Sequence, residues 1–329
     1  MRKVAIIGAG HMGRVHGTVY AEMPNAEPVA FVDCRLDGAE ELAKSFGAQA
    51  FTDFDEMLRA ANPDVIDVCV PTPCHKEYVI KAAEAGKHVV TEKPMAPSLA
   101  DCREMIAATE KAGVTFMIAH VLRFFPEFVK AKAQIDAGAV GNPAVIRTTR
   151  GGGFPTGTGR DWYADFAQSG GVVLDLIIHD FDWLRWTFGE VDRVFAKGLV
   201  EKGIPRLDYA LVTLRMKSGA IAHVEGTWAN PGGFRVKFEV AGDKGMLDFQ
   251  SENAAPLKVA STKAGAAASG VAIPESPTGE NPYYLELEHF IECIETGRKP
   301  MISPEDGMRA VEISLAALES IKTGKLVKL

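Results

Sequence analysis

The first part of the chain alternates short apolar runs with longer segments in which apolar residues recur at helical spacing. The short runs predict strands at residues 4–7, 29–32, 65–70, 88–90 and 115–119. Short buried strands that alternate with helices are typical of a parallel sheet with right-handed crossovers. We therefore predict an α/β domain with a doubly wound parallel sheet over residues 1–120.

A different pattern follows residue 120, where the strand candidates are longer and partly alternate between apolar and polar positions. They lie at residues 144–150, 191–200, 209–216, 220–227 and 235–241. Turn sequences at 217–219 and 242–245 favour antiparallel pairing. Residues 121–329 are therefore predicted to form an α+β domain with an open, mostly antiparallel sheet. Within it, we expect a loop at residues 262–282 and the last helix at residues 304–322.

The composition narrows the class of ligand. The length of 329 residues favours two domains, and the net charge of -7 argues against nucleic acid as a partner. No apolar run reaches the roughly 18 residues of a membrane span, and the N-terminal segment becomes glycine-rich at Gly8, before a signal-peptide apolar region could form. We expect a cytoplasmic protein that binds a small molecule and no membrane.

The cysteines predict neither disulfides nor a zinc site. They are scattered, odd in number and contain no Cys-x-x-Cys pair. We expect reduced thiols in or near hydrophobic cores, at Cys34, Cys69, Cys74, Cys102 and Cys293.

A glycine-rich turn follows the first predicted strand and opens a helix. Its sequence, GAGHMG at residues 8–13, has the G-x-G-x-x-G spacing of dinucleotide-binding Rossmann domains. Gly8 permits a tight turn, Gly10 allows a pyrophosphate to approach, and Gly13 allows close packing of helix on strand. The helix N-terminus adds amides and a positive dipole end. We expect His11 and Met12, inside the turn, to contact the cofactor as well.

The residue at the end of the second predicted strand indicates which dinucleotide binds. Asp33 lies about 20 residues after the glycines, where a carboxylate accepts hydrogen bonds from the adenosine ribose. Its charge repels a 2′-phosphate, so NAD is favoured over NADP. Arg35 is able to hold that phosphate, which leaves NADP open. The purely structural interpretation of Asp33 is a solvated strand end.

A lysine stands just after the fourth predicted strand, in the sequence Glu92-Lys93-Pro94. Ligands of open parallel sheets bind at the carboxyl ends of strands, so Lys93 is predicted to point into the cofactor crevice. The proline restricts the backbone around it. The alternative is a solvated surface lysine.

Three ionisable residues in segment 170–182 allow three interpretations. Helical spacing places Asp175 and His179 one turn apart on a face that also includes Asp182. Together the three residues could form a metal site, and His179 alone could be a hydrogen-bonded core residue. The third interpretation is an acid–base pair in which Asp175 orients or charges His179 for proton transfer at an alcohol. We favour this pair and expect no metal.

These elements together resemble the Gfo/Idh/MocA family, which includes glucose-fructose oxidoreductase and inositol dehydrogenase. The resemblance covers essentially the whole chain. Besides the glycine turn, its motifs are His16, Pro71-Thr72-Pro73-x-His75, Gly86-Lys87-His88-Val89, Glu92-Lys93-Pro94, Arg123-Phe124-x-Pro126 and Gly171-x-x-x-Asp175-x-x-x-His179. It implies a Rossmann domain followed by a domain built on an open sheet.

The resemblance also implies roles for individual residues. Lys93 would contact the substrate hydroxyl and the nicotinamide, Asp175 would bind substrate and support the base, and His179 would exchange the proton. The residues that would lie against the cofactor are Thr72, Pro73, His75 and Glu92.

Two regions that select substrate in this family depart from its usual pattern. One contains His120, before the Arg-Phe motif, and the other covers residues 150–163. We expect substrate contacts from His120, Arg123 and Trp162. Residues 151–153 are interpreted as a flexible turn rather than a second phosphate loop, because no helix signal follows them.

The predicted activity is hydride transfer between NAD and a sugar, an inositol or a related polyol. Two other functions remain open: a non-catalytic dinucleotide-binding sugar sensor, and a glycoside hydrolase that keeps NAD bound through its turnover. The expected assembly is a homodimer or homotetramer, because an apolar sheet face rarely stays in water.

Overall fold

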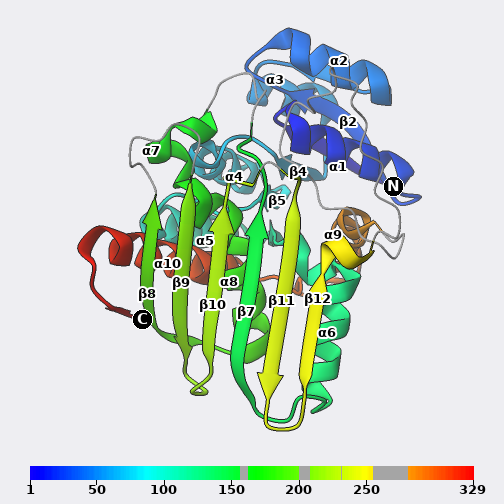
Figure 1. Cartoon of the computed structure of the whole chain (residues 1–329). Helices are drawn as coiled ribbons and strands as arrows, with labels where there is room; N and C mark the ends of the chain where they lie inside the picture. The colour runs from blue at the N-terminus through cyan, green and yellow to red at the C-terminus, as the bar shows by residue number, and fades with distance from the viewer. Residues whose placement is uncertain (156–161, 200–207, 231, 255–280) are drawn as a thin grey trace. The chain divides into compact units, whose positions relative to one another are not determined.

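The computed structural model describes residues 1–155, 162–199, 208–230, 232–254 and 281–329. The chain forms two compact units (Figure 1). The first comprises Met1–Val121 with Asn281–Met308, and the second comprises Leu122–Glu280 with Arg309–Leu329. The prediction that residues 121–329 form one domain is therefore wrong for residues 281–308, which return to the first unit.

Helix α9 (Pro282–Thr296) is the reason for this return. It packs against α1 (His11–Glu22) and buries apolar side chains that include Leu287 and Phe290. Periodicity in the sequence identifies such a helix but does not identify its partner.

The first unit is built on a parallel sheet with strand order β3-β2-β1-β4-β5-β6. The strands are β1 (Arg2–Ile7), β2 (Ala26–Val32), β3 (Gln49–Phe51), β4 (Val65–Val68), β5 (His88–Glu92) and β6 (Phe116–Ala119). Every pair in this sheet is parallel, which confirms the predicted doubly wound arrangement. The edge strand β3 was not predicted, because three residues with one buried side chain produce no apolar run.

Helices of ordinary sequence connect these strands. They are α2 (Leu36–Phe46), α3 (Phe54–Ala61), α4 (His75–Glu84) and α5 (Leu99–Ala112), with a short 3₁₀ turn η1 (Thr72–Cys74) before α4. Side chains cap two of the N-termini: Asp53 accepts the Glu56 N–H, and Ser98 accepts the Asp101 N–H. Strand β4 is completely buried and β1 is buried from Val4 to Ile7, and ligands of such open parallel sheets bind at the carboxyl ends of the strands.

The second unit contains a seven-stranded sheet with order β12-β11-β7-β10-β9-β8-β13. Its strands are β7 (Pro143–Gly151), β8 (Val191–Leu199), β9 (Tyr209–Met216), β10 (Ile221–Thr227), β11 (Arg235–Gly242), β12 (Met246–Gln250) and β13 (Val327–Lys328). Only the β7–β10 pair among these is parallel, which confirms a mostly antiparallel sheet. The sequence did not predict β12 and β13, which lie at the two edges.

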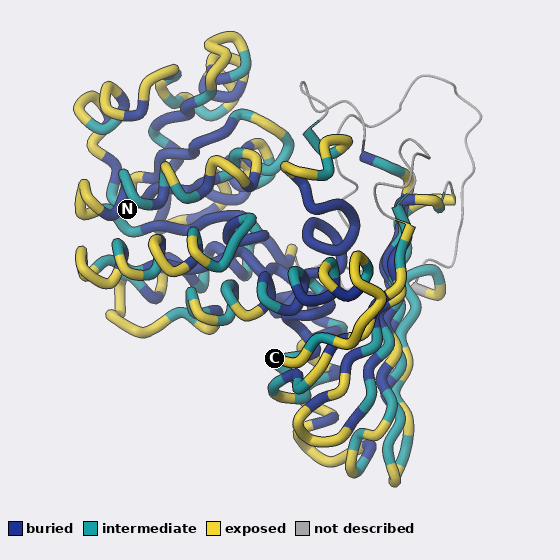
Figure 2. Tube along the Cα trace, turned by 90° about the vertical axis from the view of Figure 1, so that its left-hand side faces the viewer, coloured by how far each residue is buried: buried dark blue, intermediate teal, exposed yellow. Residues whose placement is uncertain are grey.

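Helices cover one face of this sheet. They are α6 (Pro126–Asp136), α8 (Ile178–Phe188) and the second-unit part of α10 (Pro304–Thr323), and a short α7 (Phe166–Ser169) precedes α8. An aromatic cluster of Phe128, Trp183 and Phe238, with ring centroids 5.1–5.2 Å apart, joins α6 and α8 to β11. Figure 2 shows buried and exposed positions alternating along the strands, as expected for a sheet with one covered face.

Several local predictions can be compared with the structure. The turn at residues 217–219 joins β9 to β10, and the turn at 242–245 joins β11 to β12. The predicted loop at 262–282 lies outside the described residues, except for its last two, which cap and begin α9.

Two local predictions are wrong. Residues 151–153 are not a flexible turn, because β7 extends to Gly151 and Gly153 forms a β-bridge with Ala229. Cys34 and Cys74 are exposed rather than near a core, because Cys34 lies in the turn after β2 and Cys74 lies in the 3₁₀ turn η1.

Gly13→Ala is expected to lower the free energy of unfolding of the cofactor-free protein by about 1–3 kcal/mol. The reason is that a Cβ at this position would lie 1.9 Å from the Gly8 carbonyl oxygen. Gly10→Ala is the matched control, since a Cβ there meets nothing within 4 Å and its φ of -82° suits alanine. Urea unfolding followed by circular dichroism measures both variants, and equal stability would contradict the close packing.

Candidate active site

The glycine turn after β1 has the geometry of a phosphate-binding loop. Gly8 has a φ of +107°, which favours glycine, and it packs against the backbone of Cys69 at the end of β4. Gly13 lies against the Gly8 carbonyl, so α1 begins close to the sheet. Gly10 faces open space, where a bound group is able to approach the backbone.

The N-terminus of α1 is suited to binding an anion. Gly10 is its N-cap and supplies no side-chain hydrogen bond, and its first turn contains no acidic residue. The unpaired amides and the dipole of this helix end therefore favour a pyrophosphate. His11 and Met12 are half-buried here, and burial together with Arg14 lowers the pKa of His11, which keeps its ring neutral.

Asp33 lies just beyond β2 and organises the turn with its carboxylate. Its Oδ2 accepts the Ala9 N–H and its Oδ1 accepts the Arg35 N–H, both at 2.9 Å. Oδ1 also lies 3.6 Å from the Cys34 thiol, whereas Oδ2 keeps a second lone pair for a ribose hydroxyl. Arg35 is exposed at the N-cap of α2. Asp33, which favours NAD, and Arg35, which could hold the 2′-phosphate of NADP, therefore lie in the same turn.

The loops after β4 and β5 are joined by a buried histidine. His75 Nδ1 lies 2.9 Å from the Pro94 carbonyl oxygen, and its Nε2 lies 2.8 Å from that of Val70. Burial lowers the pKa of His75, so the neutral ring donates to one carbonyl at a time. Its nitrogens therefore link the segments that follow β4 and β5. Thr72 is buried and Pro73 is exposed in the same loop.

Lys93 follows β5 directly and forms a cis peptide bond with Pro94. Its backbone N–H donates to Glu92 Oε2 at 3.0 Å. Burial raises the pKa of the Glu92 carboxyl, but His16 and Lys93 outweigh it and hold that pKa below its usual value. Glu92 is therefore an anion next to Lys93.

In the second unit, the predicted single helix around Asp175 and His179 consists of two elements. Val172–Leu176 is a π-helical turn (η4), closed by a 3.0 Å hydrogen bond from the Ile177 N–H to the Val172 carbonyl. Asp175 lies in this turn and is 3% exposed, whereas half-buried His179 lies in the first turn of α8. The expected regular α-helical spacing is therefore wrong, and π-turns of this kind are frequent at functional sites.

Small and polar residues produce the irregular turn. Gly171, with a φ of +62°, leads into it, and Asp208 Oδ2 accepts the Val172 N–H at 3.2 Å. Gly226 on β10 makes room for Ile177, since a Cβ at Gly226 would lie 2.5 Å from the Ile177 Cγ2. The backbone that carries Asp175 is therefore packed tightly on the sheet.

Two buried arginine–aspartate pairs hold α8 just after His179. Arg123 donates from Nε and Nη2 to the two carboxylate oxygens of Asp182, at 2.8 and 2.6 Å. Arg150 on β7 donates from Nε to Asp180 Oδ2 at 2.6 Å. Each of the four side chains is at most 2% exposed, so each charge depends on its partner.

These pairs change two interpretations made from the sequence. Asp182 is committed to Arg123 and does not act as the third ligand of a metal site with Asp175 and His179. Arg123, for which a substrate contact was predicted, is buried and directs two of its nitrogens to Asp182. Its role in this structure is to fix α8.

The other residues predicted to bind substrate belong to different units. His120 follows β6 in the first unit, is fully buried, and donates its backbone N–H to the Ile118 carbonyl at 2.9 Å. Trp162, in the second unit, is half-buried and its ring centroid lies 4.1 Å from that of Tyr163. Residues 156–161 of the same segment lie outside the described residues.

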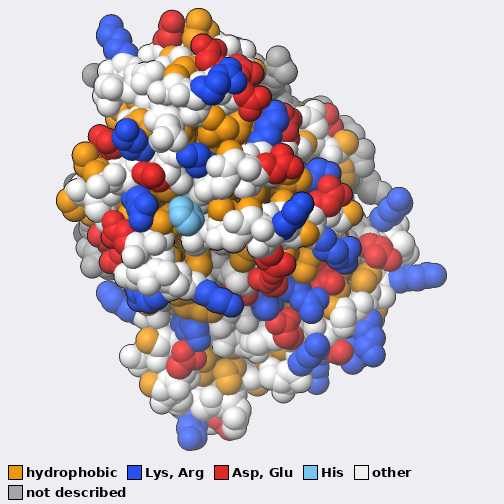
Figure 3. Space-filling model, turned by 180° about the vertical axis from the view of Figure 1, so that it is seen from behind, with side chains coloured by type: hydrophobic (Ala, Val, Ile, Leu, Met, Phe, Trp, Pro, Cys, Tyr) orange, Lys and Arg blue, Asp and Glu red, His pale blue; other side chains and the backbone are white. Residues whose placement is uncertain are grey.

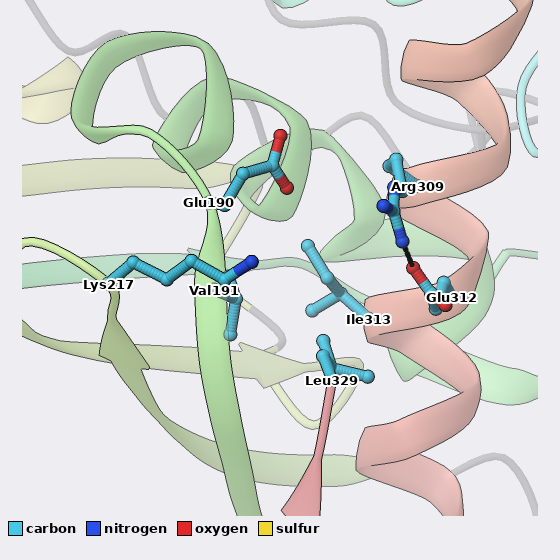
Figure 4. A pocket seen from close by; sticks show the side chains of 7 residues that line it. All are labelled: Glu190, Val191, Lys217, Arg309, Glu312, Ile313 and Leu329. Carbon is cyan, nitrogen blue, oxygen red and sulfur yellow. Dashed lines mark hydrogen bonds and ion pairs between the residues drawn. The ribbon is translucent and has the colours of Figure 1, made fainter.

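A small pocket of the second unit contains none of these residues (Figure 4). Its lining residues are Glu190, Val191, Lys217, Arg309, Glu312, Ile313 and Leu329. The acidic and basic side chains are balanced, and Arg309 forms an ion pair with Glu312. This pocket therefore attracts no ion by net charge and is not the candidate site.

The molecular surface gives no sign of a polyanion-binding face in the view of Figure 3, where acidic and basic side chains are interspersed. Among the described residues, no helix is both long and apolar enough to cross a membrane.

Sequence analysis missed two groups of residues that form buried ionic contacts in the structure. Asp67 is a fully buried acid on β4 that contacts His16, and its signal is a charge inside the apolar run Val65-Ile66-Asp67-Val68. Arg150 and Asp180 have a weaker signal, because two charges far apart in sequence do not reveal that they pair.

Comparisons with known families identify both units. Residues 2–120 match the model of the oxidoreductase family with an NAD-binding Rossmann fold, and residues 128–248 match that of the GFO/IDH/MocA C-terminal domain.

Individual relatives match over nearly the whole chain. Myo-inositol 2-dehydrogenase of Thermotoga maritima is 33% identical over 99% of this chain and 98% of the relative. Scyllo-inositol 2-dehydrogenase (NAD(+)) of Bacillus subtilis is 30% identical over 99% of this chain and 96% of the relative. The crystal structure of GenD2 from gentamicin A biosynthesis, in complex with NAD, has a TM-score of 0.89 and 26% identity, covering 100% of this chain and 96% of that one.

Asp33→Ala is expected to weaken NAD binding about 10- to 100-fold, the usual range for losing hydrogen bonds to a charged acceptor. NADP binding should weaken less, because the repulsion of its 2′-phosphate disappears. Fluorescence titration with both dinucleotides measures the change, and Glu40→Ala, an exposed acid on α2, is the control. Equal losses for NAD and NADP would show that Asp33 acts only by holding the Ala9 turn.

Proposed function

Because the chain belongs to the Gfo/Idh/MocA family of NAD-binding oxidoreductases, we propose that it transfers a hydride between NAD and one carbinol carbon of an inositol. The observation that carries this proposal is the match of two inositol dehydrogenases along 99% of the chain. The chain supplies suitable polar groups in both units: Lys93 in the first, and Asp175 and His179 in the second.

In the oxidising direction, Lys93 donates a hydrogen bond to the reacting hydroxyl and stabilises the negative charge that develops on its oxygen. His179 accepts the hydroxyl proton, and Asp175 binds a neighbouring hydroxyl and supports the protonated ring. Bound NAD supplies the nicotinamide carbon that takes up the hydride. The carbinol thus loses one hydride and one proton and becomes a ketone.

The positions of these residues support their roles. Lys93 stands at the carboxyl end of a parallel strand, at the same edge of the sheet as the turn that fits a dinucleotide. His179 is half-buried, so part of its side chain is accessible to a ligand. Asp180 and Asp182, which follow it in α8, form ion pairs with arginines. The proton acceptor is therefore set on a rigid helix, as precise positioning requires.

We also propose that the protein is a homodimer or homotetramer formed through the outer face of the second sheet. The strand register pairs Leu199 with Tyr209 and Lys197 with Leu211, so these side chains share a face with Phe195. Phe195, Leu199 and Leu211 are each 36–47% exposed. An apolar group of this kind on a broad sheet favours association.

Lys93→Met and His179→Asn are each expected to lower kcat by about 100- to 10,000-fold, the range for a positioned acid or base. NADH formation is measured with myo-inositol, scyllo-inositol and a panel of aldoses. NAD binding should persist because the glycine turn is unchanged. The controls are Lys87→Met, before β5, and His223→Asn, on β10.

The double variant should lose much less than the product of the single losses, since Lys93 and His179 act on one hydroxyl. Stable, NAD-binding single variants with wild-type activity would refute both roles. NAD binding without turnover of any substrate would indicate a sensor, and glycoside cleavage without net NADH would indicate a hydrolase.

Light scattering at micromolar concentration is expected to give a mass of at least twice the 35.4 kDa of one chain. Leu211→Glu should lower that mass, because it places a charge on the proposed contact face. Val129→Glu, at a similarly exposed apolar position on α6, should not. A wild-type mass near that of one chain would exclude this assembly.

A further inference from the structure

A buried histidine joins α1 to two central strands of the first unit. His16 is fully buried, one turn beyond the glycine turn. Its Nδ1 lies 2.8 Å from Asp67 Oδ2 on β4, and its Nε2 lies 3.2 Å from Glu92 Oε1 at the end of β5. The reaction proposed above gives this histidine no role.

The two carboxylates determine the charge of the ring. Because each nitrogen faces a carboxylate, only the doubly protonated imidazolium offers an N–H to both Asp67 and Glu92. Burial disfavours this cation, but Asp67 and Cys69 outweigh burial and hold the pKa of His16 well above its usual value. Burial of either carboxylate without a counter-charge would be strongly destabilising.

The other titratable groups around the ring do not replace this charge. Burial raises the pKa of the Cys69 thiol and of the Tyr20 phenol, so both remain protonated. From α9, the Tyr283 ring centroid lies 6.3 Å from that of His16. Glu286, also on α9, is fully buried and influences the pKa of Tyr20, but its side chain carries no positive charge. His16 therefore supplies the positive charge that lies between Asp67 and Glu92, and Lys93 adds positive charge beside Glu92.

Glu92 connects this charge to Lys93. Its Oε1 faces His16, while its Oε2 accepts the Lys93 backbone N–H at 3.0 Å. The ion pair at one oxygen and the hydrogen bond at the other restrict the orientation of the carboxylate, and with it that of the Lys93 N–H. His75 holds the next residue, through the Pro94 carbonyl. The backbone around Lys93 is therefore held from two sides.

We propose that His16 is a positioning residue of the hydride-transfer reaction, whose imidazolium bridges Asp67 and Glu92 and thereby fixes the backbone that carries Lys93. This inference rests on the role of Lys93 in the proposed function. It assigns His16 an effect on turnover without any contact between His16 and the substrate.

A metal ion is the competing explanation of the same cluster. The ligand atoms of His16, Asp67 and Cys69 lie within 4.8 Å of one another. In the structure, however, these groups contact each other directly, with Cys69 Sγ 3.3 Å from Asp67 Oδ1 and 3.4 Å from His16 Nδ1. A metal would also require a thiolate and a neutral histidine, against the protonation that burial and the carboxylates favour here.

The kinetic test compares His16→Asn, Glu92→Gln, their double variant and Lys93→Met, with His88→Asn at the other end of β5 as control. Asparagine keeps a donor for Asp67 but is too short to reach Glu92. We expect His16→Asn to lower kcat for inositol oxidation roughly 10- to 100-fold, as for a misplaced catalytic group. KM should change less than about threefold. The double variant should lose little more than the worse single variant.

A second measurement does not depend on activity. Nitrogen-15 NMR of histidine-labelled, cofactor-free protein reports the protonation of each ring nitrogen, and the His16 signals are those lost in His16→Asn or His16→Gln. We expect both nitrogens to be protonated at pH 7, whereas an ordinary histidine, with a pKa of about 6.5, is mostly neutral there. A neutral His16 ring at pH 7 would overturn the proposal.

The outcomes separate this inference from the proposed function. Wild-type activity of Lys93→Met would overturn both. An inactive Lys93→Met together with wild-type kcat in His16→Asn would overturn the inference alone. One equivalent of metal in the wild type, lost in His16→Asn and accompanied by inactivation with a chelator, would assign the cluster to a metal instead.

Discussion

The first unit depends on one close approach between backbone segments, where α1 meets the turn that follows β1. A Cβ at Gly13 would lie 1.9 Å from the Gly8 carbonyl oxygen, and a Cβ at Gly8 would lie 2.5 Å from that of Cys69. Because no side chain separates these segments, α1 lies near enough to the sheet for His16 to reach Asp67 and Glu92. The dinucleotide turn and the ion-paired histidine are two results of one packing constraint.

The second unit positions its polar residues by a different means. Its π-turn carries Asp175, and the lack of a side chain at Gly226 lets this turn pack closely on the sheet. Buried ion pairs connect α8 to β7 and to the segment before α6. Such pairs are costly to break because the remaining partner is left as an unpaired buried charge. They therefore favour a single register of α8, and with it a single placement of His179.

The extent to which sequence predicts this molecule follows from the range of each interaction. Strands β1, β2 and β9 and the glycine turn depend on neighbours in sequence, so apolar runs and spacing identify them. The edge strands β3, β12 and β13 are only two to five residues long, so they contain too few alternating positions to be identified from the sequence.

The candidate site divides in the same way. Motif spacing is enough to select Lys93, Asp33 and the glycines, because strand-end positions follow from the order of the elements. The π-turn, the commitment of Arg123 to Asp182 and the ion pairing of His16 depend on which surfaces meet in three dimensions. The Arg-Phe motif led to the prediction that Arg123 contacts substrate, but it did not reveal that Arg123 is buried and paired with Asp182.

The return of residues 281–308 to the first unit bears on how the chain folds during synthesis. When residue 121 leaves the ribosome, the sheet of the first unit is complete. Helix α9, which packs against α1 and places Tyr283 beside His16, has not yet been made. At 5–20 residues per second, the intervening segment takes roughly ten to thirty seconds to translate. The nascent dinucleotide-binding domain thus exposes an apolar surface during this time. It reaches its full stability only when α9 has been synthesised and has packed against α1.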